Sequence, residues 1–295
     1  MTALRTCELC PRKCKVNRFE TVGFCRQTDQ IKIARSDLHF WEEPCISGTN
    51  GSGTVFFSGC TLKCIFCQNH EISQQDKGYY ISVEELADIF LMLQDKGAHN
   101  INLVSPTPHV LHIIKALDMV KGKLHIPIVY NCGGYERVET LKLLENYVDI
   151  YLPDMKYFDN ALAVEYSSAP EYFNIAMSAI KEMVRQVGKP QFDSDGIMQK
   201  GVIIRHLALP THRNDSIEAI RALGENFSKD EIMLSLMSQY IPQYKAIGHS
   251  KIGRRISTFE YNKILDVAEK YCFAGFSQER NSAKDIYIPP FSDKK

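Results

Sequence analysis

The sequence lacks an excess of charge of either sign. Its 295 residues include 35 lysines and arginines and 35 aspartates and glutamates, which gives a formal net charge of +0 at pH 7. Proteins that bind nucleic acid or an acidic membrane over a broad surface usually carry a basic excess, so this balance argues against both. A local basic pocket remains compatible with it.

Long hydrophobic runs are also absent. No stretch of about 18 apolar residues offers a membrane span. The first residues, MTALRTCELCPRKCK, have no apolar core of the kind found in secretion signals. We therefore expect a cytoplasmic protein, in which structural disulfides are rare because thiols stay reduced. A glycine-rich loop ending in Lys-Ser or Lys-Thr, the usual phosphate-binding motif, is missing as well.

Cysteine is scarce after residue 67, where only Cys132 and Cys272 occur. The other eight cysteines are Cys7, Cys10, Cys14, Cys25, Cys45, Cys60, Cys64 and Cys67. Since disulfides are not expected, so uneven a distribution indicates metal binding.

Beyond residue 50, short apolar runs alternate with longer amphipathic stretches. The runs predict strands at 53–59, 101–106, 126–134, 148–157, 200–210, 231–242 and 273–277. The stretches predict helices at 83–97, 109–122, 135–147, 171–188, 215–227 and 258–272. Ser82 and Glu85 form a capping box at the start of the first of these helices.

This alternation predicts an α/β protein with a parallel sheet. It leaves two architectures open, a full or partial (β/α) barrel and an open doubly wound sheet. We expect a cysteine-rich extension over 1–50, the β/α domain over 51–284 and an extended surface tail over 285–295.

Polar residues follow several of the predicted strands, at the end where functional groups gather in both architectures. The candidate cofactor-binding residues among them are Ser105, Thr107, Asn131, Asp154, Lys156 and Arg205. Asp154 and Lys156 are two positions apart and face the same side of a strand, either for function or as a plain ion pair. Arg205 and His206 face opposite sides, and a structural role suits His206.

Three cysteines stand at metal-ligand spacing in SGCTLKCIFCQNHEIS, and no fourth cysteine follows. Cys60, Cys64 and Cys67 suit an iron–sulfur cluster that leaves one iron open for chemistry. Three alternatives are a zinc site completed by His70, a cluster shared with Cys45, and cysteines that are merely buried.

The C-x3-C-x2-C loop after the first strand of a β/α fold resembles the radical S-adenosylmethionine (SAM) superfamily. The resemblance implies a partial (β/α)6 barrel of the TIM type with a [4Fe–4S] cluster on Cys60, Cys64 and Cys67. It further implies that SAM binds the open iron and is split to a 5′-deoxyadenosyl radical that abstracts hydrogen. Phe66 matches the aromatic position that lies near the adenine in that family.

Within the superfamily, Cys67-Gln-Asn-His70, Asn131-Cys-Gly-Gly-Tyr135 and Leu152-Pro-Asp-Met-Lys156 resemble the activating enzymes of glycyl radical enzymes, such as the pyruvate formate-lyase activating enzyme. That subtype implies an oxidoreductase with a glycyl radical enzyme as substrate and a flavodoxin or ferredoxin as electron donor. The open alternatives are a small-molecule substrate, another protein residue, and a non-catalytic electron-transfer protein.

One departure from the family concerns the SAM amino group. Family members often have Gly-Gly-Glu after the second strand, whereas this chain has Ser105-Pro-Thr-Pro108. The carboxylate is missing, and the expectation is that Ser105 or Thr107 supplies an oxygen in its place.

A second cysteine group lies near the start of the chain and contains four thiols within nineteen residues. Its members, Cys7, Cys10, Cys14 and Cys25, are enough to close a structural zinc site or an auxiliary iron–sulfur cluster. Lys13, Lys15 and Arg18 beside them are expected to be solvated charges or to steer a protein donor.

Overall fold

The structure is a computed structural model that describes residues 2–277. Its sheet contains β1 (Ile31–His39), β2 (Ser52–Phe57), β3 (Tyr79–Ile81), β4 (Ile101–Val104), β5 (Ile128–Cys132), β6 (Ile150–Pro153), β7 (Gln191–Phe192), β8 (Met198–Leu207), β9 (Met233–Met237) and β10 (Ala274–Ser277). The strand order is β10-β9-β8-β6-β5-β4-β2-β1-β3, with β7 paired to β8. Strands β2, β4, β5, β6, β8, β9 and β10 are parallel.

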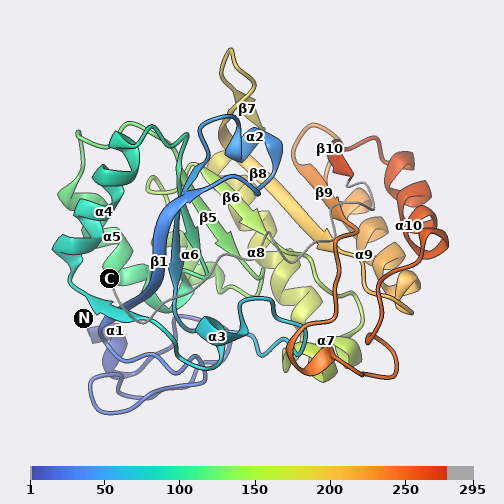
Figure 1. Cartoon of the computed structure of the whole chain (residues 1–295), viewed down its shortest axis with the longest axis horizontal. Coiled ribbons are helices and arrows are strands. Elements are labelled where there is room, and N and C mark those ends of the chain that lie inside the picture. Colours follow the sequence, from blue (N-terminus) through green and yellow to red (C-terminus); the bar gives the residue numbers. More distant parts are fainter. Residues whose placement is uncertain (1, 278–295) are drawn as a thin grey trace.

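The sheet curves into part of a barrel and does not close within the described residues, because β10 is one edge and β3 the other. Strands β6 and β8 pair over only two residues each and meet again at the Asp154–Arg205 bridge. The partial β/α barrel expected from the sequence is confirmed. Figure 1 shows the curved sheet with helices around its outer face.

The helices follow the strands in the expected alternation. The long ones are α4 (Val83–Asp95), α5 (Val110–Met119), α8 (Tyr172–Val187), α9 (Arg213–Asn226) and α10 (Thr258–Lys270). The short ones are α1 (Thr2–Arg5), α2 (Pro44–Ser47), α3 (His70–Ser73), α6 (Val138–Lys142), α7 (Asn160–Ser167) and the 3-10 turns η1 (Thr107–His109) and η2 (Tyr244–Ala246). Among the described residues, no helix is long and apolar enough to cross a membrane.

Local chemistry explains where these helices begin. The Ser82 hydroxyl accepts the Glu85 amide, and the Glu85 carboxylate accepts the Ser82 amide, so the predicted capping box is present. Ser257 and Glu260 form a second capping box at the start of α10. Such a cap satisfies backbone donors that the first turn otherwise leaves free.

The segment before the barrel takes a part in the sheet that the sequence pattern did not predict. Strand β1 pairs antiparallel with both β2 and β3, so it extends the sheet beyond the barrel strands. After β1 the chain turns into α2, at the amino end of the parallel strands (Figure 1). There Cys45 and Ile46 are buried against a cluster of Val129, Ile150, Leu152, Met198, Ile203 and Met233.

We call α2 the plug, because it fills the barrel interior at the end where the parallel strands begin. The plug is anchored because Asn100 donates to the Ile46 carbonyl at 2.7 Å and accepts from the Ser52 hydroxyl at 2.6 Å. Cys45 is a small buried residue of this apolar cluster. The main core lies between the sheet and helices and is a separate, larger cluster.

Several local predictions differ from the structure. The helix expected over 135–147 is helical only at Val138–Lys142, and the elements β1, β3, β7 and α7 were not predicted. Because β1 joins the sheet, the expected extension over 1–50 contributes to the barrel; the division into domains stays a prediction. The tail expected over 285–295 lies outside the described residues.

Candidate active site and the two cysteine groups

A cavity of about 250 Å³ opens at the carboxyl ends of the parallel strands. Its wall includes Cys64, Phe66 and Cys67 from the loop after β2, and Asn131, Asp154, Lys156 and Arg205 from the ends of β5, β6 and β8. The structure therefore brings together most of the residues that the strand-end argument selected. Gln239 and Tyr240, near the end of the predicted strand at 231–242, also line the cavity, and Trp41 and Glu42 join the wall from a segment that the argument did not select.

The loop that carries Cys60, Cys64 and Cys67 is held by hydrogen bonds to its neighbours. Ser167 donates to the Cys64 sulfur at 2.9 Å, and the Cys67 sulfur lies 3.3 Å from the Ser73 hydroxyl. Burial, together with the nearby Cys64, raises the pKa of Cys60 to about 11 and that of Cys67 to about 12.

These thiols fit an iron–sulfur cluster by the chemistry of the donor set. Three soft sulfur donors on one short loop, two of which line the cavity, suit iron or zinc better than a hard cation. Buried neighbouring thiols ionise together only when a metal compensates their charge. Within residues 2–277 no three or more such side chains are already arranged to hold a single metal ion, so the fit rests on the donors themselves.

A charged network lies in the same cavity wall as the cysteine loop, with Lys156 close enough to Cys64 to interact with its charge. Asp154 accepts from Lys156 Nζ at 2.5 Å and from Arg205 Nε at 2.9 Å. Arg205 also donates to the Asn131 side-chain oxygen at 2.7 Å. The two cations hold the pKa of Asp154 below its usual range against the effect of burial, and Asp154 in turn raises the pKa of Lys156 and Arg205.

The backbone around this network is tightly constrained. The Tyr172 hydroxyl lies 2.8 Å from the Gly133 carbonyl, 2.7 Å from the Asp154 carbonyl and 3.0 Å from the Lys156 amide. A Cβ at Gly134, where φ is +77°, would lie 2.1 Å from the Asp154 carbonyl oxygen. Gly134 is therefore needed to let the ends of β5 and β6 approach each other.

Glu42 and Glu43, just before the plug, lie close to this charged network, and neither was among the residues predicted from the sequence. The Glu42 carboxylate lies 3.4 Å from Arg205 Nη1 and accepts from the Asn131 amide at 3.5 Å. Burial raises the pKa of both Glu42 and Glu43, and Arg205 counteracts the rise. The sequence offers only a weak signal for them, two consecutive acids next to the aromatic pair Phe40 and Trp41.

Two of the predicted cofactor contacts are not brought into the cavity. Ser105 and Thr107 are absent from its wall, and the Thr107 hydroxyl instead donates to the buried Glu136 carboxylate at 2.7 Å. The reason is that the chain turns directly into η1 after β4, which points Thr107 away from the strand ends. Of the residues in the cavity wall, Glu42 supplies a carboxylate that the Gly-Gly-Glu position lacks.

The histidines of the barrel are structural in their contacts. His206 is buried on the opposite side of β8 from Arg205 and bonds the Met155 carbonyl at 2.6 Å. His109 is fully buried and bonds the Ser58 carbonyl at 3.1 Å, and His112 is buried on α5. His70 stacks on Tyr244 with ring centroids 4.6 Å apart.

The four-cysteine segment before the barrel forms a compact lobe. The backbone turns tightly, since the Lys15 amide bonds the Cys7 carbonyl at 2.9 Å and the Lys13 amide bonds the Cys10 carbonyl at 3.1 Å. A Cβ at Gly23 would lie 3.0 Å from the Cys14 sulfur, so glycine lets this turn pack against that thiol. Burial raises the pKa of Cys10 to about 12, and the charges of Cys25 and Cys14 contribute, so these thiols are neighbours.

The lobe is fastened to the barrel beside the three-cysteine loop. Arg12 donates to the Thr61 carbonyl at 2.9 Å, and its guanidinium carbon lies 3.8 Å from the centre of the Phe24 ring. Arg18 is buried and donates to the Pro108 carbonyl at 2.6 Å. The expectation that Arg18 is a solvated or steering charge is therefore wrong, because it joins the lobe to the barrel; Lys13 and Lys15 are exposed.

Comparison with known proteins identifies the family. Residues 54–224 match the model of the Radical SAM superfamily. The chain is 35% identical over 277 residues to a protein described as uncharacterized protein MJ0674 from Methanocaldococcus jannaschii, covering 90% of this chain and 75% of that one.

Solved structures share the fold at low identity. Methylornithine synthase (PylB) is 16% identical, with a TM-score of 0.51 over 73% of this chain and 60% of that one. SuiB of Streptococcus suis bound to its precursor peptide SuiA is 14% identical, with a TM-score of 0.51 over 75% of this chain and 46% of that one. The chain thus spans less than two thirds of either structure.

Proposed function

The chain belongs to the radical SAM superfamily and is a radical SAM enzyme, and we propose that Cys60, Cys64 and Cys67 hold its [4Fe–4S] cluster. The observation that carries this proposal is the position of the loop. It places Cys64 and Cys67 in the wall of a cavity that also carries a charged network suited to an amino acid group. When bound, the cluster and SAM supply an electron and a 5′-deoxyadenosyl radical for hydrogen abstraction.

The residues of this chain would bind and orient SAM. Lys156 and Arg205 suit the SAM carboxylate, because both cations line the cavity and are fixed by Asp154. Glu42 suits the SAM ammonium group in place of the missing Gly-Gly-Glu carboxylate. Phe66 and Tyr240, whose rings are 5.9 Å apart, offer an apolar wall for the adenine and exclude water from it.

We further propose that Cys7, Cys10, Cys14 and Cys25 bind a second metal centre, either zinc or an iron–sulfur cluster. Four neighbouring thiols in tight turns, with no fifth ligand required, suit a closed site. Arg12 connects this lobe to the cluster loop through Thr61. A redox role in relaying electrons from a flavodoxin or ferredoxin follows only if iron is bound.

For the substrate, we propose a glycine of a partner enzyme, as in the activating enzymes that the cluster loop and strand ends resemble. A second candidate is a different peptide residue or a small molecule. The solved structure of SuiB bound to SuiA shows that this fold, in that protein, admits a peptide. The partial barrel is open between β10 and β3 in the described residues, which leaves a side from which either kind of substrate can approach.

The deciding experiment is an anaerobic assay of reconstituted protein with reductant and SAM. Formation of 5′-deoxyadenosine supports the enzyme, and its complete absence from protein with full iron content contradicts it. Electron paramagnetic resonance then tests the substrate. A new glycyl radical on a candidate partner enzyme supports the activating role, whereas product formation with a small molecule alone supports the second candidate.

A further inference from the structure

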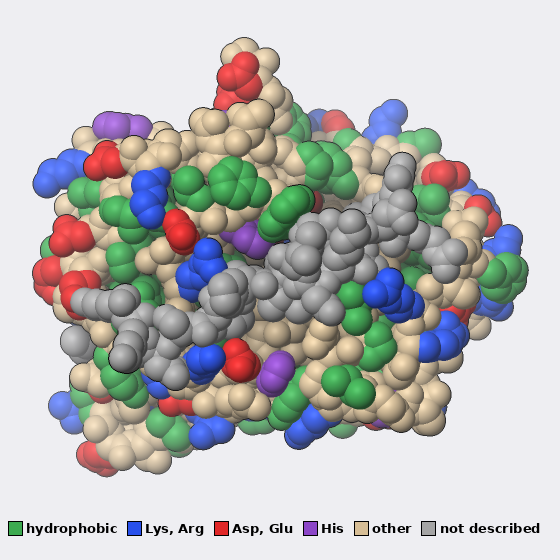
Figure 2. Space-filling model, viewed as in Figure 1, with side chains coloured by type: hydrophobic (Ala, Val, Ile, Leu, Met, Phe, Trp, Pro, Cys, Tyr) green, Lys and Arg blue, Asp and Glu red, His purple; other side chains and the backbone are tan. Residues whose placement is uncertain are grey.

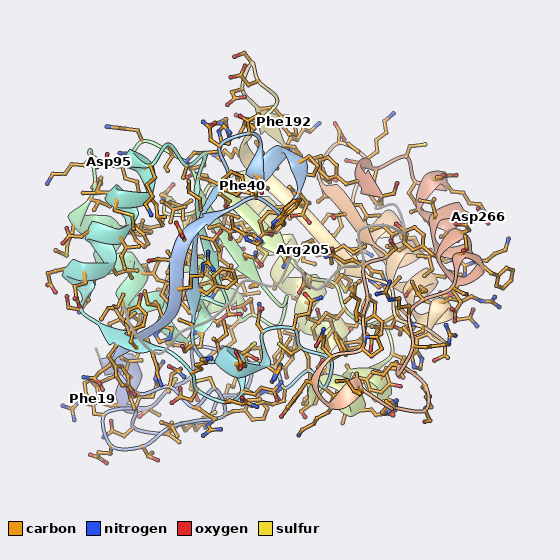
Figure 3. The ribbon with its side chains drawn as sticks, viewed as in Figure 1. Phe19, Phe40, Asp95, Phe192, Arg205 and Asp266 are labelled. Atoms are coloured by element: carbon orange, nitrogen blue, oxygen red, sulfur yellow. The ribbon has the colours of Figure 1, made fainter. Side chains whose placement is uncertain are left out.

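A second cavity of about 380 Å³ adjoins the first one at the open side of the barrel. It lies between the segment around the plug and the ends of β9 and β10, and is lined by Phe40, Trp41, Glu42, Glu43, Pro44, Ser47, Gly48, Arg205, Ser235, Met237, Gln239, Phe276 and Ser277. Trp41, Glu42, Arg205, Met237 and Gln239 line both cavities, so the two are contiguous. Figure 3 shows Arg205 near the centre of this face, with Phe40 above it toward α2.

The feature that the first cavity does not explain is Glu43. This side chain is 8% exposed and lines only the second cavity; its carboxylate contacts the Ser235 hydroxyl, while its Oε2 has no hydrogen-bond partner. None of the ion pairs among the described residues includes Glu43, although Arg205 is near. Arg205 already uses its three nitrogens on Asp154, Glu42 and Asn131.

The charge balance of the two cavities leaves one carboxylate over. Three carboxylates, on Glu42, Glu43 and Asp154, face two cations, on Lys156 and Arg205. Leaving a buried carboxylate without a partner is costly, and proteins usually compensate it with a bound or protein cation. None of the described residues that line the two cavities supplies a third lysine or arginine, so a bound cation would complete this group.

The rest of the wall indicates which cation fits. Aromatic and apolar side chains (Phe40, Trp41, Met237 and Phe276) make up much of it, with hydroxyl oxygens from Ser47 and Ser235. The Glu43 carboxylate, the serine hydroxyls and the aromatic faces suit an organic ammonium group, which gains from both the carboxylate and the rings. The large aromatic and apolar share of the wall favours such a cation over a metal ion that prefers a shell of oxygen ligands.

We propose that this second cavity is the substrate site and that Glu43 binds a primary ammonium group of the substrate. The inference rests on the proposed function, because it assigns the neighbouring first cavity to SAM. The ammonium anchors the substrate at the open side of the barrel and places its carbon chain toward the wall that the two cavities share. The ammonium belongs either to a free alkylamine or to a lysine side chain of a peptide.

The chain provides its own reporter for this site, because Trp41 is its only tryptophan and lines the cavity. Titration of the full-length protein with n-butylammonium or with an acetylated, amidated Gly-Lys-Gly peptide, followed by tryptophan fluorescence, measures binding without cluster or SAM. We expect saturable binding of at least one of the two probes, and the probe that binds identifies the source of the ammonium. Uncharged n-butanol, of similar length, should produce no saturable change.

The Glu43→Gln variant should weaken that binding by about tenfold or more, since a charge-assisted hydrogen bond is lost. Glu182→Gln is the matched control: it removes another buried carboxylate, which pairs with Arg185 on α8, and should bind as the unchanged protein does. Circular dichroism establishes that both variants fold.

No saturable change with either probe, or equal binding by Glu43→Gln, would overturn the inference. Either result is separate from the proposed function, because the deoxyadenosine assay needs no amine. A protein that binds the amine but never cleaves SAM would contradict the proposed function and leave this site in place.

Discussion

At the scale of single residues, the three thiols of the cluster loop are predicted to be essential for iron binding and for SAM cleavage. Changing Cys60, Cys64 or Cys67 to Ala should remove the iron of that cluster and abolish 5′-deoxyadenosine formation, because no other side chain of the loop supplies a thiolate. Iron content and product yield after anaerobic reconstitution are the measurements. Cys272→Ser is the control, since Cys272 is exposed and distant in sequence from both groups, and should keep both. Unchanged iron in the Cys64 variant would contradict the assignment.

Asp154 is predicted to act by fixing two cations. In Asp154→Asn, Lys156 and Arg205 lose their shared carboxylate, so we expect SAM to bind about tenfold more weakly while the iron content stays the same. Equilibrium dialysis of SAM against reconstituted protein measures the change. Asp149→Asn offers a matched comparison, because Asp149 accepts the Ile128 amide at the other end of β6 and should leave SAM affinity intact. Equal affinity of the two variants would show that the network is only structural.

Residues at strand ends were predictable from the sequence because the parallel sheet fixes where they meet. Asn131, Asp154, Lys156 and Arg205 end three different strands, and all four line the cavity. Glu42 was not predictable, since it reaches the cavity through a loop whose path no periodicity describes. Ser105 and Thr107, predicted as cofactor contacts, do not line the cavity, because the turn into η1 redirects the chain after β4.

At the scale of elements, the four-cysteine lobe is predicted to hold its own metal. Cys25→Ser should lose zinc, or the iron of an auxiliary cluster, in proportion to one site per chain, because a closed site needs all four thiolates. Metal analysis of purified protein measures this loss. Cys45→Ala tests the alternative of a shared cluster: Cys45 lies in the plug, so its loss should leave the metal content unchanged. Full metal content in Cys25→Ser would rule out the lobe as a binding site.

Which elements could be predicted depended on the strength of their periodicity. Strands β4, β5 and β6 are fully buried apolar runs, and α4 and α10 have both an apolar face and a capping box. Strand β1 was missed because its sequence, IKIARSDLH, mixes charges with apolar residues and its burial falls off after the first four positions. It is a strand because β2 and β3 pair with it, and this tertiary information is not local.

For the whole molecule, buried histidines predict sensitivity to acid. Burial lowers the pKa of His109 to about 3 and that of His112 and His206 to about 4. In the unfolded chain, these histidines take up protons near pH 6.5. The folded protein therefore loses stability relative to the unfolded chain as the pH falls from about 6.5 toward the folded pKa values. Each contributes about 1.4 kcal/mol per pH unit in that window.

The measurement is urea unfolding at several pH values between 7.5 and 4.5. His109→Gln keeps a donor for the Ser58 carbonyl but never ionises, so its free energy of unfolding should fall less steeply, by about 1 kcal/mol per pH unit. His125→Gln, at an exposed position, should retain the steeper slope. Parallel slopes for all three proteins would show that His109 is not held neutral.

Charge is balanced over the visible surface as it is over the sequence. Figure 2 shows basic and acidic side chains interspersed across this face, with no extended region of one sign. On this face, the described side chains thus repeat the balance of the sequence. The concentrated charge lies inside, at the junction of the two cavities.

The path of the first fifty residues also bears on the order in which parts of the protein can fold during synthesis. The lobe closes on itself through bonds such as that between Lys15 and Cys7, so it can take shape as soon as it leaves the ribosome. The plug and Glu42 cannot, because Arg205 is 163 residues further along the chain. We therefore expect the plug to be seated only after β8 and β9 have been synthesised. A chain truncated before β9 should lack Met237, Gln239 and Tyr240 of the cavity wall while keeping all seven cysteines of the two proposed metal sites.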